Sequence, residues 1–388
     1  MITNLHIYPS PFKFESRILR EAEVLLESGL VDKIIIASGW AKGLKKKEYV
    51  QDNIQIIRFK TLSDHLIKYH KFFLAGKYLE LYIYITLFYF LKKIDIVNAH
   101  SLMVLPIAVL LKRFDKKRKL IYDAHELETE RFGLKGKAQK YSKTLEKKLI
   151  RRCDRVIVVG NYIRKWYVKE YSLNENQIYT VRNFNNVDLE KTTSKSNYLR
   201  KHFDLNPDDI IFIYQGLLSK GRGIDIYIEA FKSVQSNFKL VLMGYGPLES
   251  EIKNICDSYS NIFFHQAVKP SEIINVTSSA DIGLCLIENY CLSYYYSLPN
   301  KLFEYVNAGI PVIGSNFPEI SELVATNGIG WVIDPGINQL IDVISSEKKL
   351  ESRIEKKNNI GTFVKKFNWR IEQLELIKTY QNLASRAK

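Results

Sequence analysis

The chain has 388 residues, and its Lys and Arg outnumber Asp and Glu by 15. A content of 46% apolar and 26% charged residues is typical of a globular protein and excludes a largely disordered one. The length predicts two domains, each able to bury its own core. Met1 to Pro11 lacks the basic start and long apolar core of a secretory signal, so we expect the chain to stay in the cytosol.

The positive charge is concentrated in the first half. Residues 1–190 hold 35 Lys and Arg against 21 Asp and Glu, whereas residues 191–388 hold 22 against 21. A basic half is typical of proteins that meet nucleic acid, an anionic membrane or an acidic substrate. Because the sequence has no helix-turn-helix, zinc-finger or RNA-binding aromatic motif, we expect no nucleic-acid partner. The four cysteines lack metal-site spacing, and we predict neither a disulfide nor a zinc site.

Apolar runs of strand length alternate with helical patterns through the first half. The runs are rich in β-branched residues and lack polar alternation, which is typical of parallel strands buried on both faces. Helices are expected at residues 15–28, 103–114 and 138–152. The predicted strands are Asn4–Tyr8, Lys33–Ala37, Ile54–Phe59, Asp95–Ala99, Leu120–Asp123, Val156–Val159 and Ile178–Val181.

Residues 62–94 interrupt this alternation. The run from Tyr78 to Leu91 is apolar and aromatic, but its 14 residues fall short of the roughly 20 that a bilayer span requires. We expect residues 81–91 to form a buried core helix. The preceding residues 62–76, which are flanked by lysines, are expected to be the more membrane-facing part.

The second half repeats the α/β scheme. We predict two doubly wound domains facing each other across a cleft, in which ligands bind at the carboxyl ends of the strands. The expected divisions are residues 1–185, an acceptor-binding and membrane-facing domain; residues 186–366, a nucleotide-sugar-binding domain; and residues 367–388, a final helix that packs back on the first domain. The predicted strands are Ile210–Tyr214, Lys239–Met243, Ile262–His265, Ile282–Leu286, Pro311–Gly314 and Trp331–Ile333.

A short helix after Ser297 organises the predicted ligand site. Ser297 is the expected N-cap, Pro299 fits the first turn, and Gly309 ends the helix. The unpaired N–H groups at its start, with Lys301 beside them, suit a phosphate. Glu304 lies more than a turn further on and could accept bonds from two sugar hydroxyls. A site for an anion beside a site for a diol would fit a nucleotide-sugar diphosphate. An ordinary capped helix with a surface glutamate remains an alternative.

A glycine-rich loop, YQGLLSKGRGID at residues 214–225, is the second candidate. Glycines between a strand and a helix let the backbone approach a phosphate, and Lys220 and Arg222 add two positive charges. The spacing differs from that of a P-loop. A solvated basic turn remains the alternative interpretation.

His125 is the third candidate, because it follows a strand predicted to end at Asp123. A histidine there could hydrogen-bond a sugar hydroxyl or steer a proton, since its pKa lies near neutrality. His100, after a neighbouring strand, is a weaker candidate. A structural role for either histidine remains open.

The ordered motifs resemble glycosyltransferase family 4, whose enzymes have the GT-B fold. The resemblance implies transfer of a sugar from a nucleotide-diphosphate donor to an acceptor hydroxyl, with retention at the anomeric carbon. It also implies a place in the assembly of bacterial surface polysaccharides or glycolipids. It rests on DAHE (123–126), KGRGID (220–225), MGYGPL (243–248), ADIG (280–283), PNKLFEY (299–305) and GIPV (309–312).

The resemblance also implies roles for individual residues. Glu304 matches the carboxylate that holds the ribose hydroxyls, Arg222 falls where the family keeps a phosphate-binding lysine, and His125 matches a histidine that contacts the transferred sugar. Tyr296 departs from the family, which often has a carboxylate at that position. With His125 as the catalytic residue, the expected donor-binding residues are Gly216, Lys220, Arg222, Leu298, Pro299, Asn300, Lys301 and Glu304.

The expected partners are the nucleotide-sugar, which is a substrate, and a sugar or lipid-linked acceptor. No cofactor is expected, and no metal, because the chain has no Asp-x-Asp motif. Two basic stretches, residues 112–119 and residues 135–152 with Lys140, Lys143 and Lys147, lead us to hypothesise contact with an anionic membrane on the inner face of the cell membrane. Two alternatives remain open: a nucleotide-sugar epimerase of the same fold, and a non-catalytic nucleotide-sugar or membrane-binding protein.

Overall fold

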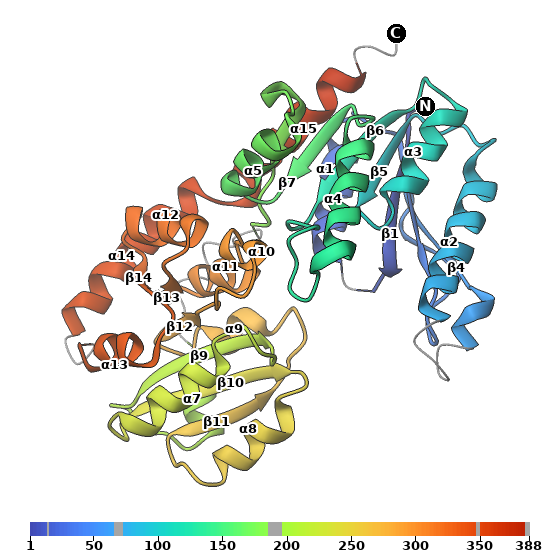
Figure 1. The fold of residues 1–388 in the computed structure, drawn as a ribbon. Coiled ribbons are helices and arrows are strands. Elements are labelled where there is room, and N and C mark those ends of the chain that lie inside the picture. The colour runs from blue at the N-terminus through green and yellow to red at the C-terminus, as the bar shows by residue number, and fades with distance from the viewer. Residues whose placement is uncertain (14, 66–72, 185–195, 347–349, 385–388) are drawn as a thin grey trace. The chain divides into compact units, whose positions relative to one another are not determined.

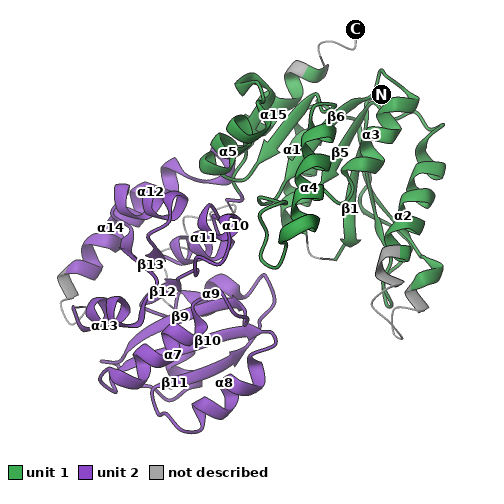
Figure 2. Cartoon of the chain, viewed as in Figure 1, with its two compact units in different colours: residues 1–182, 372–388 green, residues 183–371 purple. Residues whose placement is uncertain are grey.

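The structure is a computed structural model that describes residues 1–13, 15–65, 73–184, 196–346 and 350–384. The chain forms two compact units, residues 1–182 with 372–388 (unit 1) and residues 183–371 (unit 2), as Figure 2 shows. The final helix therefore starts in unit 2 and continues in unit 1. The boundary predicted between residues 185 and 186 lies outside the described residues.

Unit 1 is built on a mostly parallel sheet (Figure 1). Over the described residues the strand order is β3-β4-β2-β1-β5-β6-β7-β8, so β1 is central and pairs with β2 and β5. The inner strands are buried almost throughout, as expected of parallel strands that are covered on both faces. The strands are β1 Thr3–Pro11, β2 Lys33–Gly39, β3 Lys47–Gln51, β4 Ile54–Phe59, β5 Ile96–His100, β6 Lys119–Ala124, β7 Arg155–Val158 and β8 Ile178–Thr180.

Helices connect these strands, and the final helix α15 joins the sheet through buried polar contacts. The Tyr380 hydroxyl of α15 accepts hydrogen bonds from Asn98 Nδ2 at 2.6 Å and Asn4 Nδ2 at 3.2 Å. The end of the chain is thereby tied to β1 and β5. The helices are α1 Ser16–Glu27, η1 Leu62–His65, α2 Phe73–Tyr89, α3 Leu105–Phe114, α4 Gly136–Ile150, α5 Asn161–Tyr171, η2 Glu175–Gln177 and α15 Trp369–Ala384.

Two features of unit 1 differ from the predictions. Strand β3, which was not predicted, is a mostly exposed edge strand that pairs antiparallel with β4. The expectation of a buried core helix is right for only one face of α2, because Leu87 is 63% exposed and Leu91, just past the helix, is 83% exposed. Of the segment expected to face a membrane, residues 66–72 lie outside the described residues. None of the helices in the described part of the chain has the length and apolar content needed to cross a membrane.

Unit 2 contains a parallel sheet with the strand order β11-β10-β9-β12-β13-β14 over its described residues. Every strand predicted for the second half is present. Its strands are β9 Ile210–Leu217, β10 Phe238–Tyr245, β11 Ile262–Gln266, β12 Ile282–Cys285, β13 Val312–Ser315 and β14 Gly330–Ile333. Its helices are α6 Tyr198–His202, α7 Ile224–Ser233, α8 Glu249–Cys256, α9 Ile273–Thr277, α10 Leu292–Tyr295, α11 Asn300–Asn307, α12 Pro318–Thr326, α13 Ile337–Ser346 and α14 Leu350–Lys366.

Candidate active site

Helix α11 begins after Pro299, and the prediction that Ser297 caps it is wrong. Pro299 has an extended backbone (φ −73°, ψ 140°), and the helix starts at Asn300. The Ser297 hydroxyl instead donates to the Tyr294 carbonyl at 2.7 Å, because α10 ends just before it. The Leu298 side chain is buried in the core of unit 2. What this segment offers an anion is therefore the backbone N–H groups of the first turn of α11.

Glu304 is oriented by a glutamine that the sequence analysis did not single out. Gln215, buried at the end of β9, donates from Nε2 to a Glu304 carboxylate oxygen at 2.5 Å. The other end of the same amide accepts from Thr277 Oγ1 at 2.6 Å. Burial raises the pKa of Glu304, while Gln215 and Lys301 act in the opposite direction. A carboxylate fixed in this way keeps lone pairs with which it can accept the two hydroxyls of a diol.

Lys301 lies one helical turn before Glu304 and close to the glycine-rich loop. Its Nζ is 3.7 Å from the centre of the Tyr214 ring, and it would lie 3.6 Å from a Cβ placed on Gly216. The pKa of Lys301 is lowered to about 7, chiefly by burial; Arg222 acts in the same direction, and Cys285 and Glu304 oppose it. A bound diphosphate would favour the protonated form, because opposite charges stabilise each other in a desolvated site.

The two predicted cations of the loop after β9 have different surroundings. The Arg222 guanidinium lies 5.2 Å from the centre of the Tyr294 ring. Its Nε is buried and has no hydrogen-bond partner among the described residues. An unpaired buried donor costs about 1–3 kcal/mol, so a phosphate oxygen near this atom would be stabilised. Lys220 is exposed to solvent.

Glycines let this loop pack closely. Gly221 has φ +82°, and a Cβ there would lie 2.9 Å from the Tyr294 ring. The GYG motif at 244–246 supports the loop from the neighbouring strand, since a Cβ at Gly244 would lie 1.9 Å from the Gly216 carbonyl oxygen. The second glycine motif therefore has a packing role in shaping the candidate phosphate loop.

In unit 1, His125 is the partly exposed end of a network of polar side chains whose other members are buried. Its Nε2 lies 3.2 Å from an oxygen of Asp123 and 3.1 Å from Nδ1 of His100. His100 Nδ1 lies 3.0 Å from the same Asp123 oxygen, and its Nε2 lies 2.8 Å from Nδ1 of His6. The adjacent strands β1, β5 and β6 bring these side chains together. The sequence analysis missed His6, which lies within a strand and has no motif around it.

Asp123 carries the negative charge of this network of polar side chains. Arg17 of α1 donates to it at 3.2 Å, and Glu21 lies 3.0 Å from the same guanidinium. Burial alone would raise the pKa of Asp123, but Arg17 and His125 outweigh burial and hold it well below its usual value. Burial likewise opposes the charged form of His125, yet the Asp123 carboxylate raises the pKa of His125 overall.

The contacts indicate which ring nitrogen of His6 and of His100 carries the proton. The Asn4 amide nitrogen lies 3.0 Å from His6 Nε2, which makes that nitrogen the acceptor and leaves the proton on His6 Nδ1. His6 then donates to His100 Nε2, and His100 donates from Nδ1 to Asp123. Burial lowers the pKa of both His6 and His100, in keeping with one proton on each ring. His125 is the ring of this network whose pKa Asp123 raises, so its protonated form is the one that the carboxylate favours.

By distance alone, His100, Asp123 and His125 could hold a metal ion, since their ligand atoms lie within 4.8 Å of one another. Arg17 already supplies a positive charge to Asp123 at 3.2 Å. A divalent cation would have to share that carboxylate with the guanidinium, which is unfavourable. We therefore assign no metal to this group.

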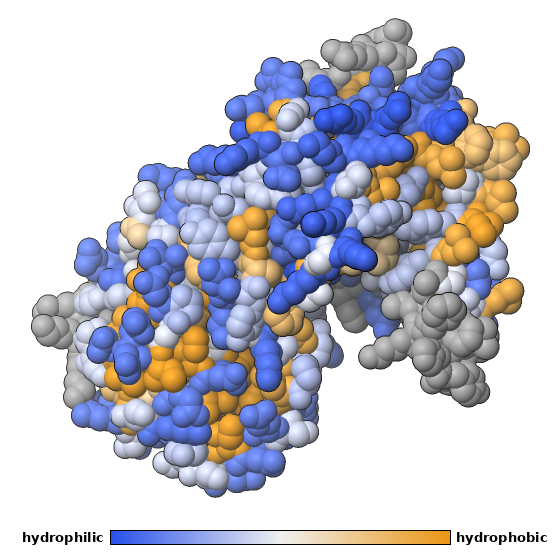
Figure 3. All heavy atoms as spheres, viewed as in Figure 1, coloured by the Kyte–Doolittle hydropathy of each residue, from blue (hydrophilic) through white to orange (hydrophobic). Residues whose placement is uncertain are grey.

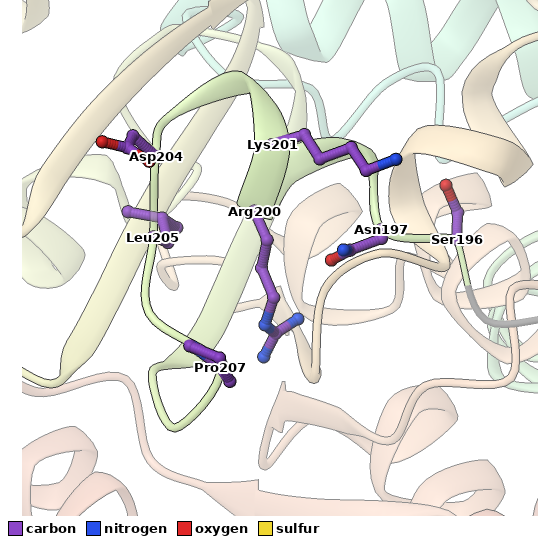
Figure 4. Close-up of a pocket in the computed structure, with 7 residues that line it drawn as sticks. All are labelled: Ser196, Asn197, Arg200, Lys201, Asp204, Leu205 and Pro207. Carbon is purple, nitrogen blue, oxygen red and sulfur yellow. The ribbon is translucent and has the colours of Figure 1, made fainter.

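A separate hollow on unit 2 has a volume of about 520 Å³ and includes none of the predicted donor-binding residues. Figure 4 shows its lining side chains around α6 and the turn that follows. Arg200, which lines it, is already paired with Asp281 at 2.9 Å and donates to the Asp209 carbonyl at 2.8 Å. These contacts hold α6 on the sheet and indicate a structural role.

The predicted site residues thus fall into two groups. Gly216, Arg222, Lys301 and Glu304 lie together in unit 2, with Lys220 exposed on the same loop. His125 lies in unit 1. Gln215 could have been suspected from its place directly before Gly216, but no charge or motif marks it.

Comparison with known proteins identifies the family. Residues 16–189 match the family described as Glycosyltransferase Family 4, and residues 196–367 match Glycosyl transferases group 1. The chitobiosyldiphosphodolichol beta-mannosyltransferase of Candida albicans is 25% identical over 269 residues, which cover 64% of this chain and 58% of the relative. The chain therefore matches less than two thirds of the length of that relative.

Solved structures share the fold. The sucrose-phosphate synthase of Thermosynechococcus elongatus has a TM-score of 0.79 at 15% identity, over 100% of both chains. HepE of Anabaena, solved in complex with UDP and glucose, has a TM-score of 0.71 at 14% identity, over 100% of this chain and 99% of that chain. Since the two family matches together take in nearly the whole chain, the protein belongs to glycosyltransferase family 4 and has the GT-B fold.

Proposed function

We propose that this glycosyltransferase takes its sugar from a nucleoside-diphosphate donor and passes it to an acceptor hydroxyl with retention at the anomeric carbon. The proposal is carried by the geometry around Glu304, a carboxylate oriented by Gln215 one helical turn from Lys301. A diol acceptor beside a cationic, N–H-rich helix start is the arrangement that a ribose with an attached diphosphate requires.

Each residue of the unit 2 group has a role in this proposal. Glu304 accepts the ribose hydroxyls. Lys301 and Arg222 meet the diphosphate, Lys220 adds charge from the loop, and the backbone N–H groups of Gly216, Leu298 and Asn300 donate hydrogen bonds, while Pro299, which has no N–H, sets the start of α11. When the bond to the sugar breaks, negative charge grows on the leaving diphosphate, and donors already in place stabilise it without reorganisation.

His125 is proposed to contact the transferred sugar. Its ring is held at Nε2 by Asp123 at 3.2 Å, and the carboxylate raises its pKa and so favours the protonated form. A protonated ring of fixed orientation can donate to a sugar hydroxyl through Nδ1. No metal takes part in this scheme.

The acceptor is proposed to be a sugar or a lipid-linked sugar in the assembly of a surface polysaccharide or glycolipid. The name of the C. albicans relative refers to a dolichol-linked compound, and HepE was crystallised with UDP. These relatives support the class of donor and acceptor and leave the nucleotide base and the sugar open.

The test is incubation with a panel of radiolabelled nucleotide-sugars and a membrane lipid extract. Transfer of label to the lipid fraction, lost in Glu304→Gln, is the expected result. Conversion of the nucleotide-sugar without transfer would identify an epimerase instead, and binding without turnover would identify a binding protein. Retention is checked by NMR of the product: an α-linked donor should give an α-linked product, and a β-linked product would contradict it.

A further inference from the structure

Helix α2 is apolar on two opposite faces, and the protein buries only one of them. Leu81, Ile85 and Tyr89 are fully buried against the rest of unit 1. Between them, Leu79, Ile83 and Leu87 recur every four residues and are 61%, 47% and 63% exposed. A helix that is apolar all round is normally buried all round, so this second face is unusual on a protein surface.

The exposed face of α2 continues onto α3. The Phe90 ring, just past α2, packs 5.9 Å from the ring of Phe114 at the end of α3, and Phe114 is itself 57% exposed. Tyr82 of α2 donates its hydroxyl to the Met103 carbonyl before α3, which holds the two helices together. Figure 3 shows hydrophobic residues gathered along the part of unit 1 that Figure 1 labels α2. We call this surface the apolar strip; it consists of Leu79, Ile83, Leu87, Leu91, Leu110 and Phe114.

A basic groove lies on the other side of α3. Its volume is about 690 Å³, and six of its eight lining residues are cations from α3, α4 and the turns that follow them. Lys112 forms an ion pair with Asp154 at 2.6 Å; the other five cations form no ion pair with a residue that the structure describes. The lining residues are Val109, Lys112, Arg113, Lys116, Lys148, Leu149, Arg151 and Arg152.

The pairing of these two surfaces selects among the possible occupants. Nucleic acid or a soluble anion would account for the groove and leave the leucines of α2 exposed. A second copy of this chain, docked by two-fold symmetry, would bring one basic groove toward another. An anionic bilayer satisfies both surfaces, since its phosphate headgroups meet the cations and its acyl boundary takes the apolar side chains.

We propose that unit 1 docks on an anionic lipid bilayer through the apolar strip, with lipid phosphates held in the basic groove between α3 and α4. This goes beyond the proposed sugar transfer and narrows the expected contact to part of the two basic stretches that the sequence marked. Of the three lysines of α4 singled out there, Lys143 forms an ion pair with Glu130 and lies 5.5 Å from the ring centre of Trp166. A lysine that already forms an ion pair interacts less strongly with an anionic membrane.

The test is flotation of the full chain with vesicles of phosphatidylcholine alone or mixed with phosphatidylglycerol. Two double variants probe the two surfaces: Ile83→Ser with Leu87→Ser for the strip, and Arg113→Glu with Arg151→Glu for the groove. The matched controls are Leu374→Ser, an exposed leucine on α15, and Lys269→Glu with Lys201→Glu, two exposed lysines of unit 2.

We expect the wild-type chain to float with the phosphatidylglycerol vesicles at low salt and to be released by about 0.5 M salt, where screening reaches a few ångströms. Each basic residue removed from the interface should weaken partitioning about fivefold. The groove variant should therefore lose binding by well over tenfold, and the strip variant should also fail to float. Both controls should float as the wild type does.

Three results would overturn the proposal: a wild-type chain that stays unbound, a strip variant that floats normally, or a control that loses as much binding as the groove variant. Calorimetry with inorganic phosphate distinguishes a soluble anion site, because phosphate binding without flotation would refute bilayer docking. Nucleotide binding measured on the same variants keeps the two proposals apart, since it should be unchanged whether or not the membrane contact exists.

Discussion

The Nε2 atom of Gln215 lies 2.5 Å from a carboxylate oxygen of Glu304, across 89 positions of sequence. This contact joins the end of β9 to the middle of α11 and fixes the orientation of the carboxylate that we assign to the ribose. Because the opposite end of the same amide accepts from Thr277 at 2.6 Å, the amide has little freedom to turn.

Substitution of either residue should weaken donor binding. Glu304→Gln loses a charge-assisted bond to the diol, which is worth about 1.5–3 kcal/mol, or roughly ten- to a hundredfold in Kd. Gln215→Leu should lose less, because the carboxylate remains but is no longer held. Calorimetry with nucleoside diphosphates measures both, and thermal unfolding provides the check that the fold is kept. Affinity unchanged in Glu304→Gln would remove Glu304 from the site.

Arg222→Ala should weaken binding of the diphosphate far more than binding of the bare nucleoside. The reason is that only the diphosphate carries the charges that the guanidinium meets. Lys220→Ala, on the same loop but exposed, is the matched comparison and should have the smaller effect. Equal losses for nucleoside and diphosphate would show that Arg222 acts on the fold of the loop instead.

Lys301 predicts a pH dependence of donor affinity. Its pKa of about 7 in the free protein means that the side-chain amine is about half protonated at neutral pH. Binding of a diphosphate raises that pKa, so the affinity should be full below pH 7 and fall as the pH rises above it. Calorimetry in buffers of different ionisation enthalpy should detect proton uptake on binding. In Lys301→Met this uptake should be missing; its persistence would assign the proton to another group.

The outline of the fold follows from the sequence, and its polar details do not. Apolar runs of strand length marked every parallel strand, including β8 and β14, which are largely half-buried. The edge strand β3 was missed, because KEYVQ (47–51) is polar and mostly exposed and becomes a strand by pairing with β4. Ser297 is a residue type that commonly caps helices, but its hydroxyl donates to the Tyr294 carbonyl of the preceding helix α10.

The candidate site was likewise predicted only in part from the sequence. Charged and glycine-rich motifs marked Arg222, Lys301 and Glu304 directly. Gln215 and His6 act through partners 89 and 94 positions away, and no local sequence pattern identifies these contacts. Their roles become visible only when the sheet order places the strands side by side.

A stability prediction concerns Glu146 of α4, which is fully buried. Tyr122, Tyr167 and Tyr171 all donate their hydroxyls to its carboxylate, at 2.6, 2.7 and 2.6 Å. Removing one hydroxyl by Tyr167→Phe should cost about 1.5–3 kcal/mol, the range for hydrogen bonds to charged groups. The midpoint of urea unfolding of unit 1 should fall accordingly. Tyr141→Phe, on the exposed side of the same helix, should leave the midpoint unchanged.

The last prediction concerns the protonation of His125. Asp123 raises the pKa of this ring above its ordinary value of 6.5, against the effect of burial. The charged ring therefore stabilises unit 1 fully below pH 6.5, and that contribution is lost as the pH rises through the raised pKa. NMR titration of the histidine ring signals should show His125 titrating above 6.5, while His6 and His100 remain neutral down to lower pH because burial depresses their pKa values.

Asp123→Asn separates this explanation from a merely structural one. The substitution removes the charge but keeps the shape, and Glu21 remains 3.0 Å from Arg17 to balance the guanidinium. The titration of His125 should then move to lower pH, and the pH at which transfer activity falls should move with it. His265, in unit 2, serves as the internal reference and should not shift. If activity falls at the same pH in both proteins while the His125 signal moves, then the protonated ring is not what the transfer requires, and His125 only shapes the pocket around the sugar.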